Sequence, residues 1–103
     1  MEFNYSESTI EKSIVISVIG DCDMYNAREF MTNIMEKMNS GFSTVCIDFS
    51  GVVYLDSSGV GAIIKSVQLS KEKKVTLKFR GITGTPRKVL KMSNILTIIN
   101  EDI

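Results

Sequence analysis

The sequence predicts a single α/β domain over residues 1–103, built as a mixed, partly parallel β-sheet of four to five strands with helices packed mainly on one side. Three observations predict this fold class. Strand-like and helix-like segments follow each other in the order β-β-α-β-α-β-α-β. Parallel strands require a crossover, which the helical segments supply. The length is that of one domain, and no repeat, linker or low-complexity tract divides the chain.

The first half of the chain predicts two strands and a helix. Residues 3–8 are a weak strand candidate, and the β-branched run 14–19 is typical of a buried strand. We expect these two strands to pair antiparallel at one sheet edge, and residues 20–23 to turn. A helix from Tyr25, closed near Gly41, follows from apolar residues at helical spacing, namely Ala27, Phe30, Met31, Ile34, Met35 and Met38.

The middle of the chain predicts a central strand and a second helix. Residues 44–49 are apolar on both faces, as in a strand covered on both sides, and a connection is expected to begin at Ser50-Gly51. The second helix fades over residues 70–74. Its apolar positions are Val60, Ile63, Ile64 and Val67.

The last third predicts a strand, a helix and a closing strand. Residues 75–80 alternate between apolar and polar side chains. Thr85-Pro86 is typical of a helix start, with Val89, Leu90 and Met92 on the apolar side. Residues 95–99 are expected to add a short strand.

Composition excludes several classes of function. The chain has no histidine, so neither His-based acid–base catalysis nor a Cys/His metal site is possible. The two cysteines, Cys22 and Cys46, form no CxxC pair and fit a reducing compartment. No long apolar run or signal pattern is present. We therefore expect a cytoplasmic protein without a catalytic site, cofactor or metal, without nucleic-acid binding and without direct membrane insertion.

The zero net charge conceals an asymmetry. Residues 1–56 carry 9 acidic and 3 basic side chains, whereas residues 57–103 carry 9 basic and 3 acidic ones. Either the two halves attract each other within one fold, or one of them presents a charged patch to a partner. The five methionines after Met1 are expected to fill the core.

The stretch YLDSSGVG, residues 54–61, admits more than one interpretation. Asp56-Ser-Ser-Gly59 is typical of a capped helix start, with Gly59 and Gly61 allowing close packing on the sheet. A serine nucleophile is excluded because no Gly-x-Ser-x-Gly pattern or histidine is present. A Walker phosphate loop is excluded because Lys65 lies too far along the helix, although weak nucleotide binding stays open.

A third interpretation makes a serine of this stretch the substrate of a kinase. A phosphate would suit the positive end of the helix and would add about 1.5 to 2 negative charges beside Asp56. Desolvating that charge in an interface at a cost of about 3–4 kcal/mol would weaken a partner several hundredfold.

Three segments resemble the STAS domain of bacterial anti-sigma factor antagonists. They are Asp-Ser-Ser-Gly-Val-Gly at 56–61 after a strand that carries Asp48, Ile-Gly-Asp-Cys-Asp at 19–23, and residues 86–95. The resemblance spans about residues 5–100. Relative to the family pattern, Asp21 replaces the usual glutamate and Cys22 an apolar residue. The amphipathic helix that usually ends the family's domain does not follow the last predicted strand.

The resemblance implies a phosphorylation switch at Ser57. The kinase would be an anti-sigma factor that is also a GHKL-type serine kinase. The unphosphorylated chain would bind this protein and release a sigma factor, and a metal-dependent serine phosphatase would reverse the modification. Ser58 would help to cap the helix, and the partner-binding residues would be Asp23, Asp56, Ser57, Ser58 and Gly59.

Two alternatives remain open from the sequence. The chain could be a STAS scaffold or switch module of another signalling or transport complex, or a domain that senses ATP or GTP at the helix start. In each case we expect a monomer or a weak dimer.

Overall fold

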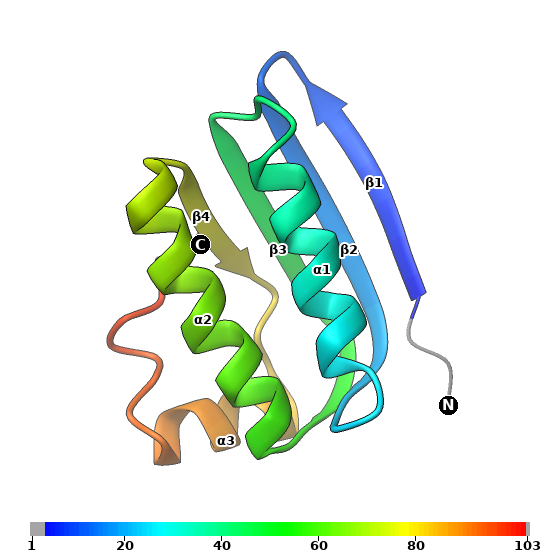
Figure 1. The fold of residues 1–103 in the computed structure, drawn as a ribbon. Helices are drawn as coiled ribbons and strands as arrows, with labels where there is room; N and C mark the ends of the chain where they lie inside the picture. Colours follow the sequence, from blue (N-terminus) through cyan, green and yellow to red (C-terminus); the bar gives the residue numbers. More distant parts are fainter. Residues whose placement is uncertain (1–3, 103) are drawn as a thin grey trace.

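A four-stranded mixed sheet forms one layer of the protein, and helices cover one of its faces (Figure 1). The computed structural model describes residues 4–102. The strand order is β1-β2-β3-β4, with β1 antiparallel to β2 and the other neighbours parallel. The strands are β1 (Asn4–Ile10), β2 (Ser13–Cys22), β3 (Thr44–Leu55) and β4 (Thr76–Arg80). The predicted fold class, including the antiparallel edge pair, is therefore confirmed.

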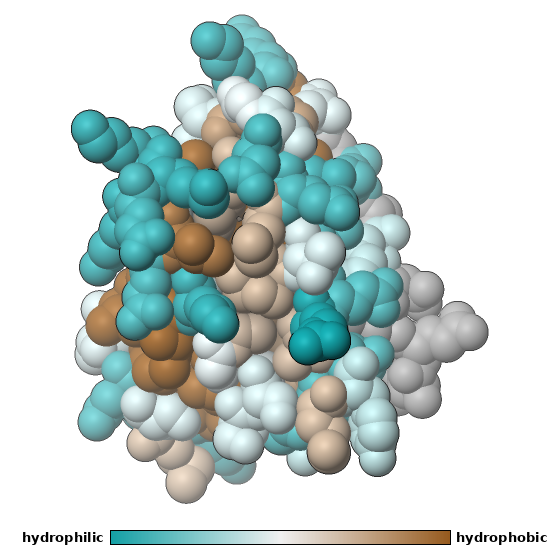
Figure 2. All heavy atoms as spheres, viewed as in Figure 1, coloured by the Kyte–Doolittle hydropathy of each residue, from teal (hydrophilic) through white to brown (hydrophobic). Residues whose placement is uncertain are grey.

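The two long helices lie side by side on the same face of the sheet (Figure 1). They are α1 (Ala27–Met38) and α2 (Ser57–Lys73), and the shorter α3 (Gly84–Met92) packs near one end of β3. Seen from this side, hydrophilic side chains cover much of the surface, and apolar ones show through beside α2 (Figure 2). Within residues 4–102, the opposite face of the sheet carries no helix.

The core is centred on three phenylalanines, one each from α1, β3 and β4. Phe49 lies between the other two, with ring centroids 5.8 Å from Phe30 and 5.7 Å from Phe79. All three side chains are fully buried. The central strand therefore joins the helical layer to the far strand through one aromatic chain of contacts, which is worth more than its buried area alone.

Two strands run further than the sequence predicts. β2 continues through the expected turn to Cys22, and β3 continues through Ser50-Gly51 to Leu55. The two strands keep pairing by means of register shifts, so that Ile19 faces Gly51. A side chain at Gly51 would place its Cβ 2.8 Å from Ile19 Cγ1. The glycine therefore marks an irregularity inside a strand rather than the strand's end.

The second helix also extends beyond its predicted fading point. Ser70 is buried, and its hydroxyl donates to the carbonyl of Val67, which satisfies a polar group inside the helix. The helix ends only after Lys73, where Lys74 takes a left-handed conformation.

Helix boundaries differ from the predicted ones at three further places. α1 begins at Ala27 rather than at Tyr25, and it is capped at Asn39 rather than at Gly41. α3 begins at Gly84, after an N-cap at Thr83, so that Pro86 occupies its third position. These differences are within the range by which helix ends commonly vary.

The predicted closing strand over residues 95–99 is wrong. These residues form turns after Asn94, which has a φ of 59°. Between residues 95 and 102, Glu101 alone forms a bridge, which is parallel and joins it to Phe79. Ile99 is nevertheless buried, so the apolar run packs on the core without adopting strand geometry.

The methionines divide between core and surface. Met38 is buried and Met31 half-buried, as predicted, and Met35 is 38% exposed. The prediction of core filling is wrong for Met35 and also for Met24 and Met92, of which the last two are 68% and 80% exposed. Neither of these two side chains contributes to the core.

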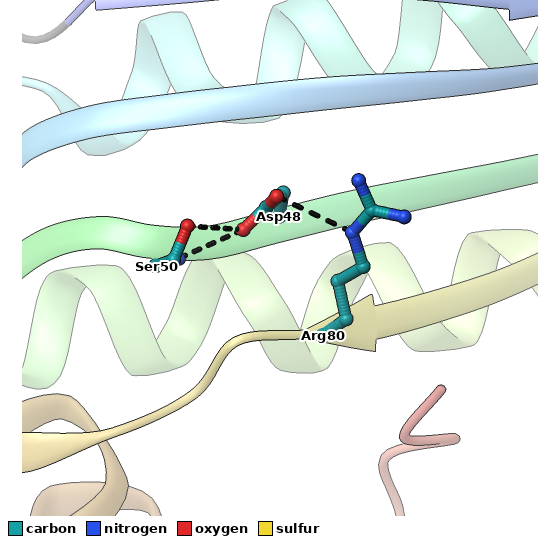
Figure 3. Close-up of polar contacts among 3 residues, drawn as sticks. All are labelled: Asp48, Ser50 and Arg80. Carbon is teal, nitrogen blue, oxygen red and sulfur yellow. Dashed lines mark hydrogen bonds and ion pairs between the residues drawn. The ribbon is translucent and has the colours of Figure 1, made fainter. Parts of the chain in front are cut away.

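A polar network occupies the helix-free face of the sheet (Figure 3). Asp48 Oδ1 accepts hydrogen bonds from the backbone N–H and the hydroxyl of Ser50 at 2.9 and 2.7 Å, and Asp48 Oδ2 lies 3.3 Å from Arg80 Nε. Partial burial raises the pKa of Asp48, but these hydrogen bonds and the Arg80 charge outweigh it, so the net shift of the pKa is downward. The network ties β3 to the end of β4.

Phe49→Ala should lower the free energy of unfolding by about 3–5 kcal/mol, because it removes the ring that contacts both other phenylalanines. Urea unfolding followed by circular dichroism measures the loss. Phe42→Ala, at a half-buried position, is the control and should cost clearly less. Equal losses would show that the aromatic chain is not the centre of the core.

Asp48→Asn should destabilise the protein by about 1 kcal/mol at pH 7. Because the folded-state pKa of Asp48 is lowered, its contribution is present above the ordinary aspartate pKa of about 4 and is lost as the pH falls through the lower folded value. Urea unfolding should therefore show the two proteins converging in stability at acidic pH. The exposed Asp102→Asn serves as control, and a difference that persists unchanged at low pH would contradict the assignment.

Candidate functional site

The start of α2 is capped by the carboxylate of Asp56. Asp56 Oδ1 accepts hydrogen bonds from the backbone N–H groups of Ser58 and Gly59 at 2.9 and 3.2 Å. Asp56 itself is extended, with φ −114° and ψ −173°, as an N-cap residue should be. The capping oxygen thus comes from Asp56, and Ser58 takes part through its N–H rather than through its hydroxyl.

The second carboxylate oxygen of Asp56 reaches a different element. Asp56 Oδ2 accepts a hydrogen bond from the backbone N–H of Met24 at 3.2 Å, across 32 positions of sequence. The backbone N–H of Asp56 donates in turn to the carbonyl of Cys22 at 3.3 Å. One residue therefore fastens the start of α2 to the β2–α1 turn, and the two lie together at one end of the molecule (Figure 1).

The β2–α1 turn is held by its own side chains. Asp23 Oδ1 accepts from the backbone N–H groups of Tyr25 and Asn26 at 3.0 and 3.2 Å. Asn26 Nδ2 donates to the carbonyl of Asp21 at 2.9 Å. Successive donors in this turn are thus satisfied locally, which fixes its shape.

Ser57 is the first residue of α2, and its side chain is exposed. Within residues 4–102 its hydroxyl has no hydrogen-bond partner. Ser58 is exposed beside it, whereas Gly59 is buried. The structure therefore brings the five predicted partner-binding residues together around one helix start, with Asp23 on the facing turn.

The two glycines of the motif have different environments. A Cβ on Gly59 would overlap the carbonyl oxygen of Cys22 and would lie 2.5 Å from Leu55 Cδ1, so only glycine allows α2 to meet the sheet this closely. A Cβ on Gly61 would have no atom within 4 Å. The expectation that both glycines serve close packing is confirmed for Gly59 and is wrong for Gly61.

Cys22 lies beneath the helix start and is fully buried. Burial, followed by the charges of Asp56 and Asp23, raises the pKa of its thiol to about 12. The thiol is therefore protonated at neutral pH. A reactive thiolate is not available here.

The described part of the chain offers no built site for a small ligand. Residues 4–102 enclose no pocket, and they contain no group of three or more potential metal-ligating side chains. Across the same residues, no helix has both the length and the apolar character needed to cross a bilayer. What the arrangement offers is a surface: an exposed hydroxyl, a rigid turn and carboxylates.

Family comparison identifies the fold to which this surface belongs. The STAS domain family matches residues 5–102, nearly the whole chain. The chain belongs to the STAS domain family. No functionally curated protein matches it in sequence.

Solved STAS structures share the fold at low sequence identity. The chain is similar to a putative anti-sigma factor antagonist from Thermotoga maritima, with TM-score 0.85, 16% identity and coverage of 96% of this chain and 86% of that one. It is also similar to the unphosphorylated form of the Bacillus anti-sigma factor antagonist SpoIIAA, with TM-score 0.78 and 19% identity. This match covers 97% of this chain and 89% of that one. A third similar structure is a sulfate transporter family protein from Wolinella succinogenes, with TM-score 0.76 and 10% identity. This match covers 90% of this chain and 75% of that one.

Sequence reasoning missed part of this site in the STAS domain. It assigned Met24 to the core and gave no role to Tyr25 or Asn26, although all three belong to the turn that Asp56 holds. The available signals were the expected turn at residues 20–23 and the family resemblance of residues 19–23, which assigned Asp23 to the partner-binding residues. The 32-residue link to Asp56 leaves no local pattern in the sequence.

The two glycines provide a matched pair of substitutions in one helix. Gly59→Ala should destabilise the protein by about 1–3 kcal/mol, because the new methyl group overlaps backbone and side-chain atoms. Gly61→Ala should stabilise it by about 0.5–1 kcal/mol, because alanine favours the helix and meets open space. Urea unfolding of both variants measures the effects, and equal shifts would contradict the packing described.

Proposed function

We propose that this STAS domain is a non-enzymatic regulatory protein that binds a partner through the start of α2 and is switched off by phosphorylation of Ser57. The partner is an anti-sigma factor that is also a GHKL-type serine kinase, and a metal-dependent serine phosphatase reverses the modification. The unphosphorylated form would release a sigma factor, in the cytoplasm. The observation that carries this proposal is the exposed, unbonded Ser57 hydroxyl at a rigid helix start in a STAS fold.

The local geometry supports Ser57 as the modified residue. Its hydroxyl is exposed beside the cap, so a kinase can reach it without unfolding the helix. A phosphate at the first turn of a helix interacts favourably with the helix dipole. The backbone should therefore keep its structure after modification, and the switch depends on surface charge.

The surroundings of Ser57 explain how the charge would act on a partner. The phosphate would add about 1.5 to 2 negative charges next to Asp56. The facing turn already contains Asp23, and Asp21 lies just before it near the end of β2. A partner that docks here would have to desolvate this combined charge. The SpoIIAA structures in unphosphorylated and phosphorylated forms show that a protein of this fold can carry the modification.

A second candidate is a STAS module of another signalling or transport complex. The structural similarity to a sulfate transporter family protein favours it, although at 10% identity that similarity concerns the fold alone. In that case the helix start would bind a different partner. Phosphorylation of Ser57 by a kinase-type anti-sigma factor distinguishes the two candidates.

An ATP or GTP site at the helix start finds less support. The N–H groups of Ser58 and Gly59, which a nucleotide phosphate would need, already donate to Asp56. Titration calorimetry with each nucleotide tests this alternative directly.

Incubation of the purified chain with ATP and the GHKL-type anti-sigma factor kinases of its source cell should place one phosphoryl group on Ser57. Mass spectrometry of peptides from the wild type and from Ser57→Ala locates it. Ser57→Asp should bind the same kinase at least about tenfold more weakly, because its carboxylate supplies part of the phosphate's charge.

The neighbouring serine offers a matched control for this experiment. Ser58→Ala removes an equally exposed hydroxyl one residue away and should still be phosphorylated. Labelling of Ser57→Ala to the wild-type extent, or wild-type binding by Ser57→Asp, would overturn the proposed switch.

A further inference from the structure

We propose that Met24 and Tyr25 form the apolar anchor by which this chain docks into a partner, and that the partner supplies a hydrophobic pocket with a rim of Lys or Arg side chains. This inference rests on the proposed function, because the anchor lies beside Ser57 and its two residues would bind the same kinase. It goes beyond that function by specifying the chemistry of the contact.

Met24 and Tyr25 are far more exposed than large apolar and aromatic side chains usually are. Tyr25 is 83% exposed and Met24 is 68% exposed, and they are adjacent in the chain. Within residues 4–102, neither side chain makes a hydrogen bond or an ion pair. Single exposed apolar residues are common on proteins, but two large ones together at the tip of a turn offer contact area that the fold itself does not use.

The backbone beneath the pair is rigid. The N–H of Met24 donates to Asp56, and the N–H of Tyr25 donates to Asp23. The next residue, Asn26, is held through both its backbone and its side chain. The backbone of the pair therefore needs little further ordering on binding, so that mainly the rotamer freedom of the two side chains would be lost. Large side chains presented in this way are typical of the residues that dominate interface energies.

The charge around the anchor selects its partner. Asp23 lies on the same turn, Glu29 lies in the first turn of α1, and Asp21 lies near the end of β2. Asp56 bonds to Met24, and Arg28 is the one cation within residues 21–29. None of the four carboxylates forms an ion pair with another described residue. A pocket rimmed by Lys or Arg is electrostatically complementary to these four carboxylates, which together form an acidic ring around the anchor.

The same charges disfavour other occupants. A second copy of the chain would bring an identical acidic ring against this one, and like charges across an interface are costly. An anionic lipid surface attracts basic rather than acidic segments. A protein with a basic-rimmed apolar pocket is therefore the occupant that the charges favour.

The position of the anchor also links it to the switch. Asp56 bonds to Met24 through one carboxylate oxygen and caps the helix of Ser57 through the other. A partner that seats Met24 and Tyr25 in a pocket must therefore cover the neighbourhood of Ser57. A phosphate there would stand at the edge of the buried contact.

The test measures the affinity of the anti-sigma factor kinase that phosphorylates Ser57, by biolayer interferometry at two ionic strengths. Tyr25→Ala and Met24→Ala should each weaken binding by about tenfold to hundredfold, mainly through faster dissociation. Tyr25→Phe, which keeps the ring, should stay close to the wild type. Glu29→Gln should slow association and reduce its dependence on salt.

Met92→Ala is the matched control for Met24→Ala. Met92 is 80% exposed, on α3 rather than on the β2–α1 turn, so its removal should leave the affinity unchanged. Thermal unfolding should give the same midpoint for both variants and the wild type, because both side chains are exposed. A loss of affinity in Met24→Ala alone then reports a docking contact.

The possible results separate the anchor from the proposed function. If the kinase binds and phosphorylates the wild type but binds Met24→Ala and Tyr25→Ala equally well, the anchor is wrong and the switch at Ser57 stands. If no kinase of this class binds the wild type, the proposed function is overturned and the anchor with it. If the wild type self-associates and both Met24→Ala and Tyr25→Ala abolish this, a second copy of the chain is the occupant. If the wild type binds vesicles and both variants abolish this, a lipid surface is the occupant. Either result would overturn the proposal of a partner with a basic-rimmed pocket.

Discussion

The carboxylate of Asp56 makes the contacts on which the site depends. With one oxygen it holds the first N–H groups of α2, and with the other it holds the N–H of Met24 in a turn 32 residues earlier. A helix cap is ordinarily a local device worth about 1 kcal/mol. Here the same group also sets the distance between two surface elements, so the position of Ser57 relative to the turn follows from one side chain.

The packing below this link makes it possible. Gly59 has no side chain, and the backbone of α2 can therefore approach the carbonyl of Cys22 at the end of β2. The extra length of β2 and β3 carries both strands up to that point. Asp56 and Met24 come within hydrogen-bond distance only because the ends of β2 and β3, Gly59 and the cap of α2 all lie at the same place in the fold. The function proposed for the surface is thus a consequence of backbone approach in the layer underneath.

The charge asymmetry of the sequence is resolved only in part by pairing between the halves. Of the ion pairs among the described residues, Asp48 with Arg80 joins the acidic half to the basic one, whereas Glu7 with Lys37 and Arg87 with Glu101 each stay within one half. The carboxylates around the β2–α1 turn are left without cationic partners in this part of the chain. The second interpretation of the asymmetry, a charged patch facing a partner, is the one that this turn favours.

The element order as far as α3, the partly parallel sheet, the helical layer and the capped start of α2 could all be predicted from the sequence, because periodicity and capping are local properties of the chain. The sequence could not determine that Gly51 lies inside a strand, that residues 95–99 pack without strand pairing, or that Met24 is exposed while Met38 is buried. Those outcomes depend on which segments meet across the fold. The link between Asp56 and Met24 belongs to the same class, since a hydrogen bond between distant residues has no periodicity to reveal it and exists only once tertiary packing has brought its two ends together.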